Sequence, residues 1–322
     1  MKVLVTGGAG FIGSNVVHAL INDDRVSGVK VLDNLETGRF ANVSIFKSNP
    51  KFEFIQGDIR NYEICVGAAA GVDIISHQAA LGSVPRSVKD PITTHEVNAT
   101  GTLNIFNAAR VNGIKRVVYA ASSSTYGDYP GLPKKEDTIG APISPYGVTK
   151  LVNELYAKVF AQLYNMELIG LRYFNVYGPL QNPAGPYAAV IPLFVKAILE
   201  NTSPVINGDG QTSRDFTFVD DVVEANLLAM FVEKNSAAVN QVYNIAKGEQ
   251  TTLNQLFDLL KEISGVNIGV TYGPERSGDI KHSLADISKA KNLLGYNPVT
   301  TPAEGLRKTF EWYKKNSLIF AA

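Results

Sequence analysis

The chain has 322 residues, 30 basic and 30 acidic side chains, and a single cysteine, Cys65. This length allows a nucleotide-binding domain with a second lobe, and the balanced charge argues against a nucleic-acid or membrane-surface partner. One cysteine permits no intrachain disulfide, and no apolar run is long enough to span a bilayer. The first predicted strand begins at Lys2, which leaves no room for a signal peptide. We therefore expect a cytoplasmic protein.

The first half of the chain alternates strands with helices. Short apolar runs predict strands at 2–6, 29–33, 52–56, 73–76 and 116–121. One helix is predicted at 11–21, and another begins at Asp90-Pro91, an N-cap followed by proline, and stops near Gly113. This alternation is typical of a parallel sheet with helices on both faces, so we expect an α/β fold.

The pattern changes in the second half. A helix carrying Tyr146 and Lys150 is expected to reach about Tyr164, and a sixth strand follows at 167–172. Beyond Tyr173, prolines and glycines interrupt the pattern, and shorter elements are predicted at 222–231, 241–245 and 253–263. We predict a first domain at 1–172 and a smaller mixed α/β lobe at 173–322, with the chain crossing between lobes that enclose one cleft.

A glycine loop follows the first strand. Gly7, Gly10 and Gly13 have the spacing that permits a tight turn, a close approach of the backbone to a pyrophosphate, and close packing of helix on strand. Phosphates then bind at the N-terminus of the helix. A turn without a ligand is the alternative. Because a second strand ending in Asp33 follows, the sequence favours a Rossmann-type, doubly wound dinucleotide-binding domain.

Two acidic side chains suggest which dinucleotide binds. Asp33 can accept hydrogen bonds from the adenosine ribose and would repel a 2′-phosphate, and the glycine loop holds no basic residue. NAD is therefore favoured over NADP. The alternative for Asp33 is that it only caps a turn. Asp58 and Ile59, after the third strand, are candidates to hold the adenine. The alternative for Asp58 is a plain N-cap of the helix after Asn61.

The pair Tyr146 and Lys150 suggests proton chemistry. Four residues apart on a helix, the two side chains share one face. We expect the lysine charge to lower the pKa of the phenol, and a bound oxidised nicotinamide to lower it further. Such a tyrosine can remove the proton of an alcohol near neutral pH. Ser122, Ser123 and Ser124 stand a short way upstream.

An ordered set of motifs runs almost from end to end. It comprises T-G-G-A-G-F-I-G at 6–13, G-D-I at 57–59, H-Q-A-A at 77–80, Y-G-V-T-K at 146–150 and L-R-Y-F-N-V-Y-G at 171–178. With these motifs the chain resembles the extended short-chain dehydrogenases/reductases, specifically the UDP-hexose 4-epimerases. The segments H-Q-A-A-L-G-S-V-P-R-S and N-G-D-G-Q-T-S-R-D-F are most similar to those of bacterial UDP-N-acetylglucosamine 4-epimerases.

The resemblance implies roles for individual residues. Tyr146 would be the base and acid, Lys150 would support it and bond the nicotinamide ribose, and Ser122 would bridge Tyr146 and the sugar 4-oxygen. The alternative for the serines is a strand end that satisfies its own backbone. The implied NAD-binding set is Gly7, Gly10, Phe11, Ile12, Gly13, Asp33, Asn34, Gly38, Asp58, Ile59, Gln78, Ala79, Ala80, Tyr146, Lys150 and Tyr173.

The resemblance also implies a substrate-binding set. Its members are Ser83, Ser122, Ser123, Tyr146, Asn175, Ala189, Val190, Asn207, Arg214, Arg276 and Ser283. Arg214 and Arg276 match a diphosphate clamp, because guanidinium groups suit phosphate; the alternative is plain surface charge. Ser283 stands where epimerases restricted to unacetylated hexoses carry a tyrosine, and together with the small Gly82 it would leave room for an acetamido group. The four histidines show no metal-ligand spacing, and no metal is expected.

The implied activity is 4-epimerisation of a UDP-sugar, with UDP-N-acetylglucosamine and UDP-N-acetylgalactosamine as the expected pair. UDP-glucose and UDP-galactose, a UDP-uronic acid, or a non-catalytic NAD sensor are the alternatives. A 4,6-dehydratase would need an Asp-Glu pair where Ser123 and Ser124 stand, and a UDP-glucuronate decarboxylase usually has glutamate at Ser124. Relatives also imply a homodimer through a four-helix bundle, built from the helix at about Asp90–Asn112 and the one carrying Lys150.

Overall fold

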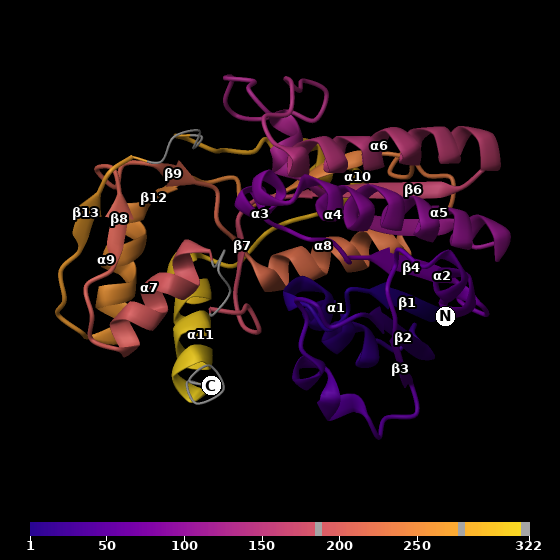
Figure 1. Ribbon diagram of the computed structural model, residues 1–322, viewed down its shortest axis with the longest axis horizontal. Coiled ribbons are helices and arrows are strands. Elements are labelled where there is room, and N and C mark those ends of the chain that lie inside the picture. Colours follow the sequence, from indigo (N-terminus) through magenta and orange to yellow (C-terminus); the bar gives the residue numbers. More distant parts are fainter. Residues whose placement is uncertain (184–188, 276–280, 317–322) are drawn as a thin grey trace.

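Seven parallel strands form the central sheet of this computed structural model, which describes residues 1–183, 189–275 and 281–316 (Figure 1). In chain order they are β1 (Lys2–Thr6), β2 (Gly28–Asp33), β3 (Phe52–Gln56), β4 (Ile74–His77), β5 (Arg116–Ser122), β6 (Glu167–Tyr173) and β11 (Val242–Ile245). Their spatial order is β11-β6-β5-β4-β1-β2-β3. The order reverses between β1 and β4, which confirms the doubly wound Rossmann-type fold predicted from the sequence.

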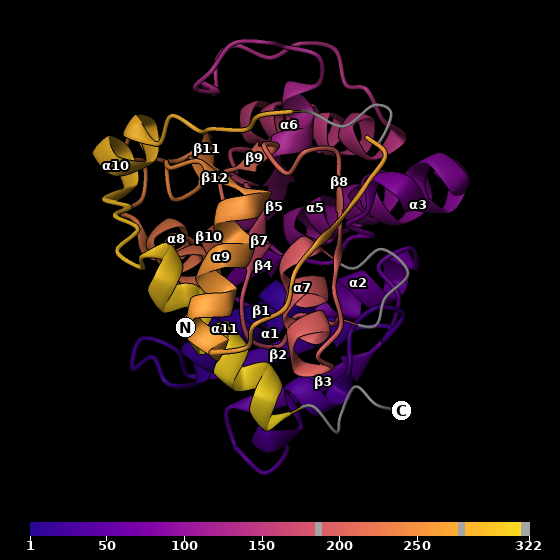
Figure 2. The same ribbon diagram turned by 90° about the vertical axis from the view of Figure 1, so that its left-hand side faces the viewer.

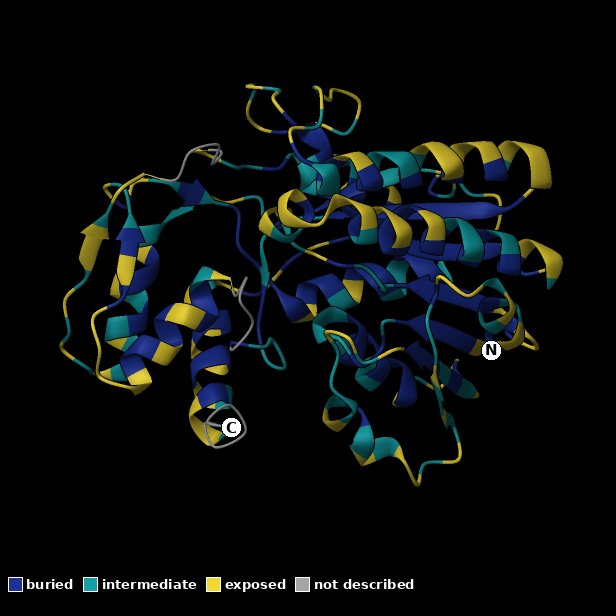
Figure 3. Cartoon of the chain, viewed as in Figure 1, coloured by how far each residue is buried: buried dark blue, intermediate teal, exposed yellow. Residues whose placement is uncertain are grey.

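Helices cover both faces of this sheet. α1 (Phe11–Ile21) and α8 (Val219–Phe231) pack on one face, and α2 (Tyr62–Ala69), α5 (Gly101–Val111) and α6 (Pro145–Tyr164) cover the other. Alternate side chains of a strand point to opposite faces, so Val3 and Val5 join the first core and Leu4 the second. Figure 3 shows the consequence, a sheet buried on both sides beneath helices with exposed outer surfaces.

Capping residues fix where two of these helices begin. The Ser144 hydroxyl accepts from the Gly147 N–H at 3.1 Å, and Pro145 opens α6. The Asp90 carboxylate likewise accepts from the Thr93 N–H at 3.1 Å at the start of α4 (Pro91–His95). The helix predicted from Asp90 towards Gly113 is thus present, but a π-helical turn at Glu96–Thr100 separates α4 from α5. Nothing in the sequence indicated that turn.

The second lobe packs around its own core. It lies beside the sheet in Figure 1 and in front of it in Figure 2. It contains α7 (Val190–Leu199), β8 (Val205–Asn207), β9 (Ser213–Arg214), β12 (Thr251–Thr252), α9 (Leu253–Ser264), β13 (Thr271–Gly273) and α11 (Pro302–Lys315). A two-stranded parallel pair, β7 (Val176–Tyr177) with β10 (Thr217–Phe218), lies where the chain passes between the lobes. No described helix combines the length and apolar character needed to cross a membrane.

Two segments lie elsewhere than the sequence suggested. Residues 222–231 and 241–245 were expected in the second lobe, but α8 packs against α1 and β11 pairs with β6 in the large sheet. α10 (Ser288–Leu294) also contributes to this core. The chain therefore first leaves the sheet after Tyr173, the last residue of β6, and returns to it in β11. Local periodicity cannot reveal which sheet a strand joins, because the pattern of apolar residues along the strand is the same in either case.

Candidate active site

The first of two adjoining cavities, of about 450 Å³, opens at the carboxyl ends of the central strands. Ligands of open α/β sheets bind at this edge, where the strand order reverses. Its lining includes almost all the residues expected to hold the cofactor, namely Gly7, Gly10, Phe11, Ile12, Gly13, Asp33, Asn34, Asp58, Ile59, Gln78, Ala79, Ala80, Tyr146, Lys150 and Tyr173. The fold thus brings together residues from six separate segments of the chain.

The glycine loop forms one wall, and its geometry admits no side chain at two positions. Gly7 has φ of +67°, and a Cβ there would lie 2.6 Å from the Ala79 nitrogen. A Cβ on Gly13 would lie 2.1 Å from the Gly7 oxygen. The missing side chains let α1 start directly behind β1, with the free N–H groups of its first turn at the cavity. This cradle fits the pyrophosphate of a dinucleotide.

Asp33 lies buried at the end of β2. One carboxylate oxygen accepts from the Ala9 N–H at 2.9 Å, and the other accepts from the Leu35 N–H at 2.8 Å. Burial raises the pKa of this carboxyl group, and these backbone hydrogen bonds oppose the rise. The turn-capping role considered from the sequence is therefore present. Each oxygen has a second lone pair, so the residue can cap the turn and still accept from a ribose hydroxyl.

Asp58, which was predicted to hold the adenine, lines the first cavity. Its carboxylate accepts from Arg60 at 2.7 and 3.0 Å and from the Asn34 amide at 2.9 Å. The Arg60 hydrogen bonds are the main reason that the pKa of Asp58 falls to about 2. Asp58 is not an N-cap, because Asn61 caps α2 itself. Gly38 does not line the cavity; a Cβ there would lie 2.9 Å from the Ala9 carbonyl carbon, so it braces the glycine loop from outside.

A hydrogen-bonded ring closes the floor of the cavity between β4, β6 and α8. The Tyr173 hydroxyl donates to the Gln78 side chain at 3.0 Å and accepts from the Asn226 amide at 2.9 Å. Gln78 in turn donates to Asn226 at 2.9 Å. Sequence reasoning named Gln78 and Tyr173 but missed Asn226, which is fully buried. Asn226 belongs to none of the motifs, and the sequence suggested that its helix, at 222–231, belongs to the second lobe.

Tyr146, Lys150 and Ser122 line the same cavity, and Ser122 stands opposite Tyr173 in the sheet. Lys150 is 3% exposed, and its Nζ donates to the Ala120 carbonyl at 2.8 Å. This Nζ lies 5.9 Å from the centre of the Tyr146 ring. The Ser122 Oγ accepts from the Ser124 N–H at 3.1 Å, which is the backbone role considered as its alternative. Because Ser122 also interacts with the Tyr146 hydroxyl, this role does not remove it from the site.

The pKa of Tyr146 differs from the sequence-based expectation. Burial raises the pKa of the phenol in the protein alone, and the hydrogen bond with Ser122 acts in the opposite direction. Lys150 does not lower it as expected, because the ammonium group is directed to Ala120. Burial lowers the pKa of Lys150 itself to about 8, and the charge of Glu154 opposes that shift. The lowering of the Tyr146 pKa by a bound oxidised nicotinamide stays a prediction.

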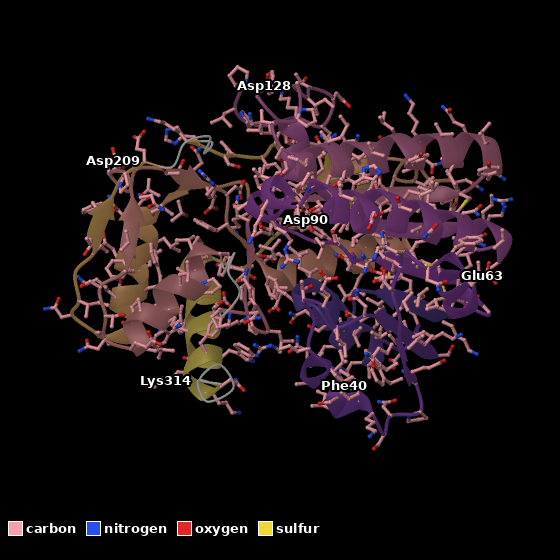
Figure 4. All side chains as sticks on the ribbon, in the orientation of Figure 1. Phe40, Glu63, Asp90, Asp128, Asp209 and Lys314 are labelled. Carbon is pink, nitrogen blue, oxygen red and sulfur yellow. The ribbon has the colours of Figure 1, made fainter. Side chains whose placement is uncertain are left out.

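A second cavity of about 700 Å³ continues from the first into the small lobe. Asn175 and Val176 line both cavities, so the two adjoin. Five residues predicted to contact substrate line the second cavity, namely Asn175, Ala189, Val190, Asn207 and Arg214. The Arg214 guanidinium donates to the Ser213 and Lys281 carbonyls at 2.9 and 3.2 Å. These hydrogen bonds tie the guanidinium to the surrounding backbone. The loop marked by Asp209 in Figure 4 joins β8 to β9 at this cavity.

Two predicted substrate residues are placed differently. Ser83 caps α3 (Val84–Lys89) by accepting from the Arg86 N–H at 3.1 Å and does not line either cavity. Ser283 also lies outside both linings; its N–H donates to the Ser213 carbonyl at 3.1 Å, one residue from Arg214. Arg276 falls outside the described residues. Ser123 lines the first cavity as predicted.

Several lining residues carried no sequence signal. The first cavity also includes Leu32, Glu36, Thr37 and Val97, and the second includes Lys196, Glu200, Thr202, Ser203 and Phe216. Leu32, near the end of β2, follows from the rule that ligands bind at the carboxyl edge of the sheet. The residues of α7 and the loop after it belong to no motif, so only the fold reveals them.

Known proteins share both the fold and these motifs. Residues 3–246 match the model of the NAD dependent epimerase/dehydratase family. The chain is 37% identical over 319 residues to the UDP-glucose 4-epimerase of Mycolicibacterium smegmatis, covering 98% of this chain and 100% of that one.

Two solved structures agree along the whole chain. The UDP-N-acetylglucosamine 4-epimerase of Methanobrevibacter ruminantium M1, in complex with UDP-N-acetylmuramic acid, is 40% identical with a TM-score of 0.91 and 98% coverage of both chains. The UDP-glucose 4-epimerase of Thermotoga maritima with UDP-glucose is 39% identical with a TM-score of 0.91, over 98% of this chain and 100% of that one. The resemblance read from the motifs is thereby confirmed, and the chain belongs to the NAD-dependent epimerase/dehydratase family.

Proposed function

We propose that this protein is an NAD-dependent 4-epimerase of UDP-sugars that prefers UDP-N-acetylglucosamine and UDP-N-acetylgalactosamine. The observation that carries the proposal is the convergence of Ser122, Tyr146 and Lys150 in the first cavity, which adjoins the second at Asn175 and Val176. A nucleotide sugar that places its UDP in the second cavity would present its sugar to these three side chains.

Each residue then has a chemical task. The glycine loop and Asp33 would hold NAD, which would supply the hydride acceptor and donor for oxidation and reduction at the sugar C4. Tyr146 removes the proton of the 4-hydroxyl group and later gives a proton back, and Ser122 aligns the 4-oxygen with the phenol. Arg214 holds the diphosphate, so the sugar alone has to turn over.

The structure supports epimerisation over elimination of water. A dehydratase needs an acidic pair after Ser122, whereas Ser123 and Ser124 here form a 3₁₀ turn at Ser123–Tyr126. The intact set of Ser122, Tyr146 and Lys150 also argues against a non-catalytic NAD sensor. Bound NAD without turnover of any UDP-sugar would favour the sensor.

The preference for acetylated sugars rests on small residues. A Cβ on Gly82, which lines the first cavity, would meet no atom within 4 Å. The Ser283 backbone pairs with Ser213, beside the proposed diphosphate residue Arg214. Ser283 itself lines neither cavity, and we propose that only the longer side chain of a tyrosine at this position would reach into the sugar site.

The test is a panel of UDP-glucose, UDP-galactose, their N-acetylated forms and UDP-glucuronic acid, with products separated and kcat/KM measured. Ser283→Tyr should lose activity on the acetylated pair and keep some on the plain pair. Ser288→Tyr, at an exposed position of α10, makes the same change away from the proposed pocket and should behave as wild type. A wild type that prefers UDP-glucose, or a Ser283→Tyr variant with unchanged preference, would disprove the acetyl preference.

A further inference from the structure

A buried ion pair lies directly behind the Tyr146–Lys150 pair. Glu154 follows Lys150 by one helical turn, so the three side chains share one face of α6. Both oxygens of Glu154 accept from Arg172, at 2.9 Å from Nε and 2.7 Å from Nη2. The two side chains are 8% and 4% exposed. This is the two-pronged geometry in which a guanidinium and a carboxylate bind most specifically.

Arg172 connects this pair to the turn that carries Ser122. Its carbon Cζ lies 4.8 Å from the centre of the Tyr126 ring, and Tyr126 closes the 3₁₀ turn that follows Ser122. In the sheet, Arg172 stands opposite Ala121, the residue before Ser122. Its Nη1 also donates at 3.1 Å to the carbonyl of Glu136, in the loop that Asp128 marks beside α6 in Figure 4. One guanidinium thus joins α6, β6 and the Ser122 turn.

Glu154 also acts on the charge of Lys150. The Lys150 ammonium donates to a neutral carbonyl, Ala120, and burial disfavours its charged form. Glu154 is the carboxylate that opposes this effect. Two other carboxylates lie on described elements packed against α6, Glu96 of the π-helical turn and Glu167 at the amino end of β6. Neither affects the pKa of Lys150, and Glu154 is the carboxylate among the described residues that raises it. His77 of β4, Tyr119 of β5, Tyr146 of α6, and Arg172 and Tyr173 of β6 carry no negative charge at neutral pH.

We infer that Glu154 and Arg172 are positioning residues for the proton transfer: the pair fixes Ser122 relative to Tyr146, and Glu154 keeps Lys150 in its ammonium form. This inference rests on the proposed function, since it concerns the reaction of the same site. The competing account is that the pair only stabilises the fold. Replacing a buried ion pair by apolar residues is often neutral for stability, whereas removing one partner is costly. The double variant therefore separates the two accounts.

The chain contains a matched control. Arg116 of β5 and Glu167 of β6 form a second buried ion pair, at 2.6 Å. They lie at the amino ends of β5 and β6, five residues from Ala121 and Arg172, roughly 17 Å along the strands at about 3.3 Å per residue. Arg116→Met/Glu167→Leu removes an ion pair from the same sheet without touching α6.

The experiment compares Glu154→Leu/Arg172→Met with this control by thermal unfolding and by the pH dependence of kcat on the best UDP-sugar. Both double variants should fold. The Glu154/Arg172 variant should lose about tenfold or more in kcat through misplacement of Ser122 and Tyr146. The alkaline limb of the pH profile of kcat should move about one pH unit lower in this variant, because Lys150 loses its proton more readily without a neighbouring carboxylate. The control should keep the wild-type profile.

Glu154→Gln keeps the size of the side chain and removes its charge, so it decides the question if the double variant does not fold. It should show the same shift of the alkaline limb, and Glu154→Asp should restore the wild-type limb. A wild-type pH profile and kcat in folded Glu154→Gln would overturn the inference while leaving the epimerase proposal intact. A wild type that turns over no UDP-sugar would overturn both.

Discussion

Tyr146 shows how a single residue depends on its surroundings. Its phenol lines the cavity, where burial raises the pKa, and the Ser122 hydroxyl opposes that rise. The protein alone therefore holds the proton on Tyr146. Because the cationic form of the proposed cofactor would favour the phenolate, proton removal becomes favourable only once the site is filled.

Replacing Tyr146 by phenylalanine tests this role. Tyr146→Phe removes one oxygen, and we expect kcat to fall by at least about a hundredfold, the usual scale for general acid–base catalysis. Substrate affinity should change little, since UDP is held elsewhere. Tyr164→Phe removes a hydroxyl from the exposed end of the same helix and should leave kcat unchanged. Near-wild-type turnover by Tyr146→Phe would refute the assignment.

His77 is buried beneath the site as a neutral side chain. Its Nδ1 lies 2.6 Å from the Thr6 hydroxyl and its Nε2 lies 2.9 Å from the Thr102 hydroxyl. Since Thr102 donates its own proton to the Asn98 carbonyl, Nε2 carries the imidazole proton and Nδ1 accepts from Thr6. Burial is the main reason that the pKa of His77 falls to about 3.

This shift predicts a loss of stability in acid. The unfolded chain titrates near pH 6.5, so between pH 6.5 and about 3 it binds a proton that the folded chain excludes. The free energy of unfolding should decrease by about 1.4 kcal/mol for each pH unit in that window. Thermal midpoints measured from pH 7 to pH 5 should fall more steeply for wild type than for His77→Gln. His95→Gln, at an exposed helix position, should retain the wild-type slope; equal slopes in all three proteins would contradict the prediction.

At the scale of elements, the contact between the glycine loop and α1 is the tightest in the cofactor site. Gly13 lies in the first turn of α1 and faces the Gly7 carbonyl, so an added methyl group must move the helix away from β1. Gly67 provides the comparison. It also lies in a helix, α2, but a Cβ there would meet no atom within 4 Å.

The same substitution should therefore have opposite effects at the two positions. Gly13→Ala should lower the thermal midpoint and weaken cofactor retention, whereas Gly67→Ala should stabilise the fold by up to about 1 kcal/mol, since alanine favours helix over glycine. Denaturing the purified wild type should release NAD or NADH, and Gly13→Ala should release less. Release of mainly NADP(H) would contradict the interpretation of Asp33.

At the scale of the whole molecule, α6 has two different faces. One packs on the sheet, while the other exposes Val148, Leu155, Val159 and Leu163 to 46%, 57%, 45% and 68%. Their spacing of seven, four and four residues places them along one stripe of the helix. Ile92 of α4, in the neighbouring segment, is 72% exposed. This stripe supports the prediction of a homodimer through a four-helix bundle.

Sedimentation can test that prediction. Wild type should sediment as a dimer, and Leu155→Glu/Leu163→Glu should shift the equilibrium to monomer, because charges in an apolar interface lose their hydration. Ile45→Glu is the matched control, since Ile45 is 70% exposed far from this helix on the β2–β3 connection. Monomeric wild type, or a dimer unaffected by both glutamates, would refute the four-helix bundle.

The sequence by itself determined what is local. Strand and helix periods, the caps at Ser144 and Asp90, and the spacing of Gly7, Gly10 and Gly13 follow from interactions within a few residues, and all are present in the structure. The position of Tyr146 and Lys150 on one helix face is equally local. The ordered motifs then identified the family, because their order along the chain is specific even where each motif is common.

Only the tertiary structure decided what depends on partners distant in the chain. It placed α8 and β11 with the large sheet, brought Asn226 to the cofactor floor, and set Glu154 against Arg172 behind Lys150. It also directed Lys150 to Ala120 and buried the Tyr146 phenol, and this burial raises the pKa of Tyr146 where the sequence had suggested a lowering. Each of these features depends on how the whole chain packs, because packing decides which side chains are buried and which neighbours they meet. A sequence pattern shows only which residues are able to be buried.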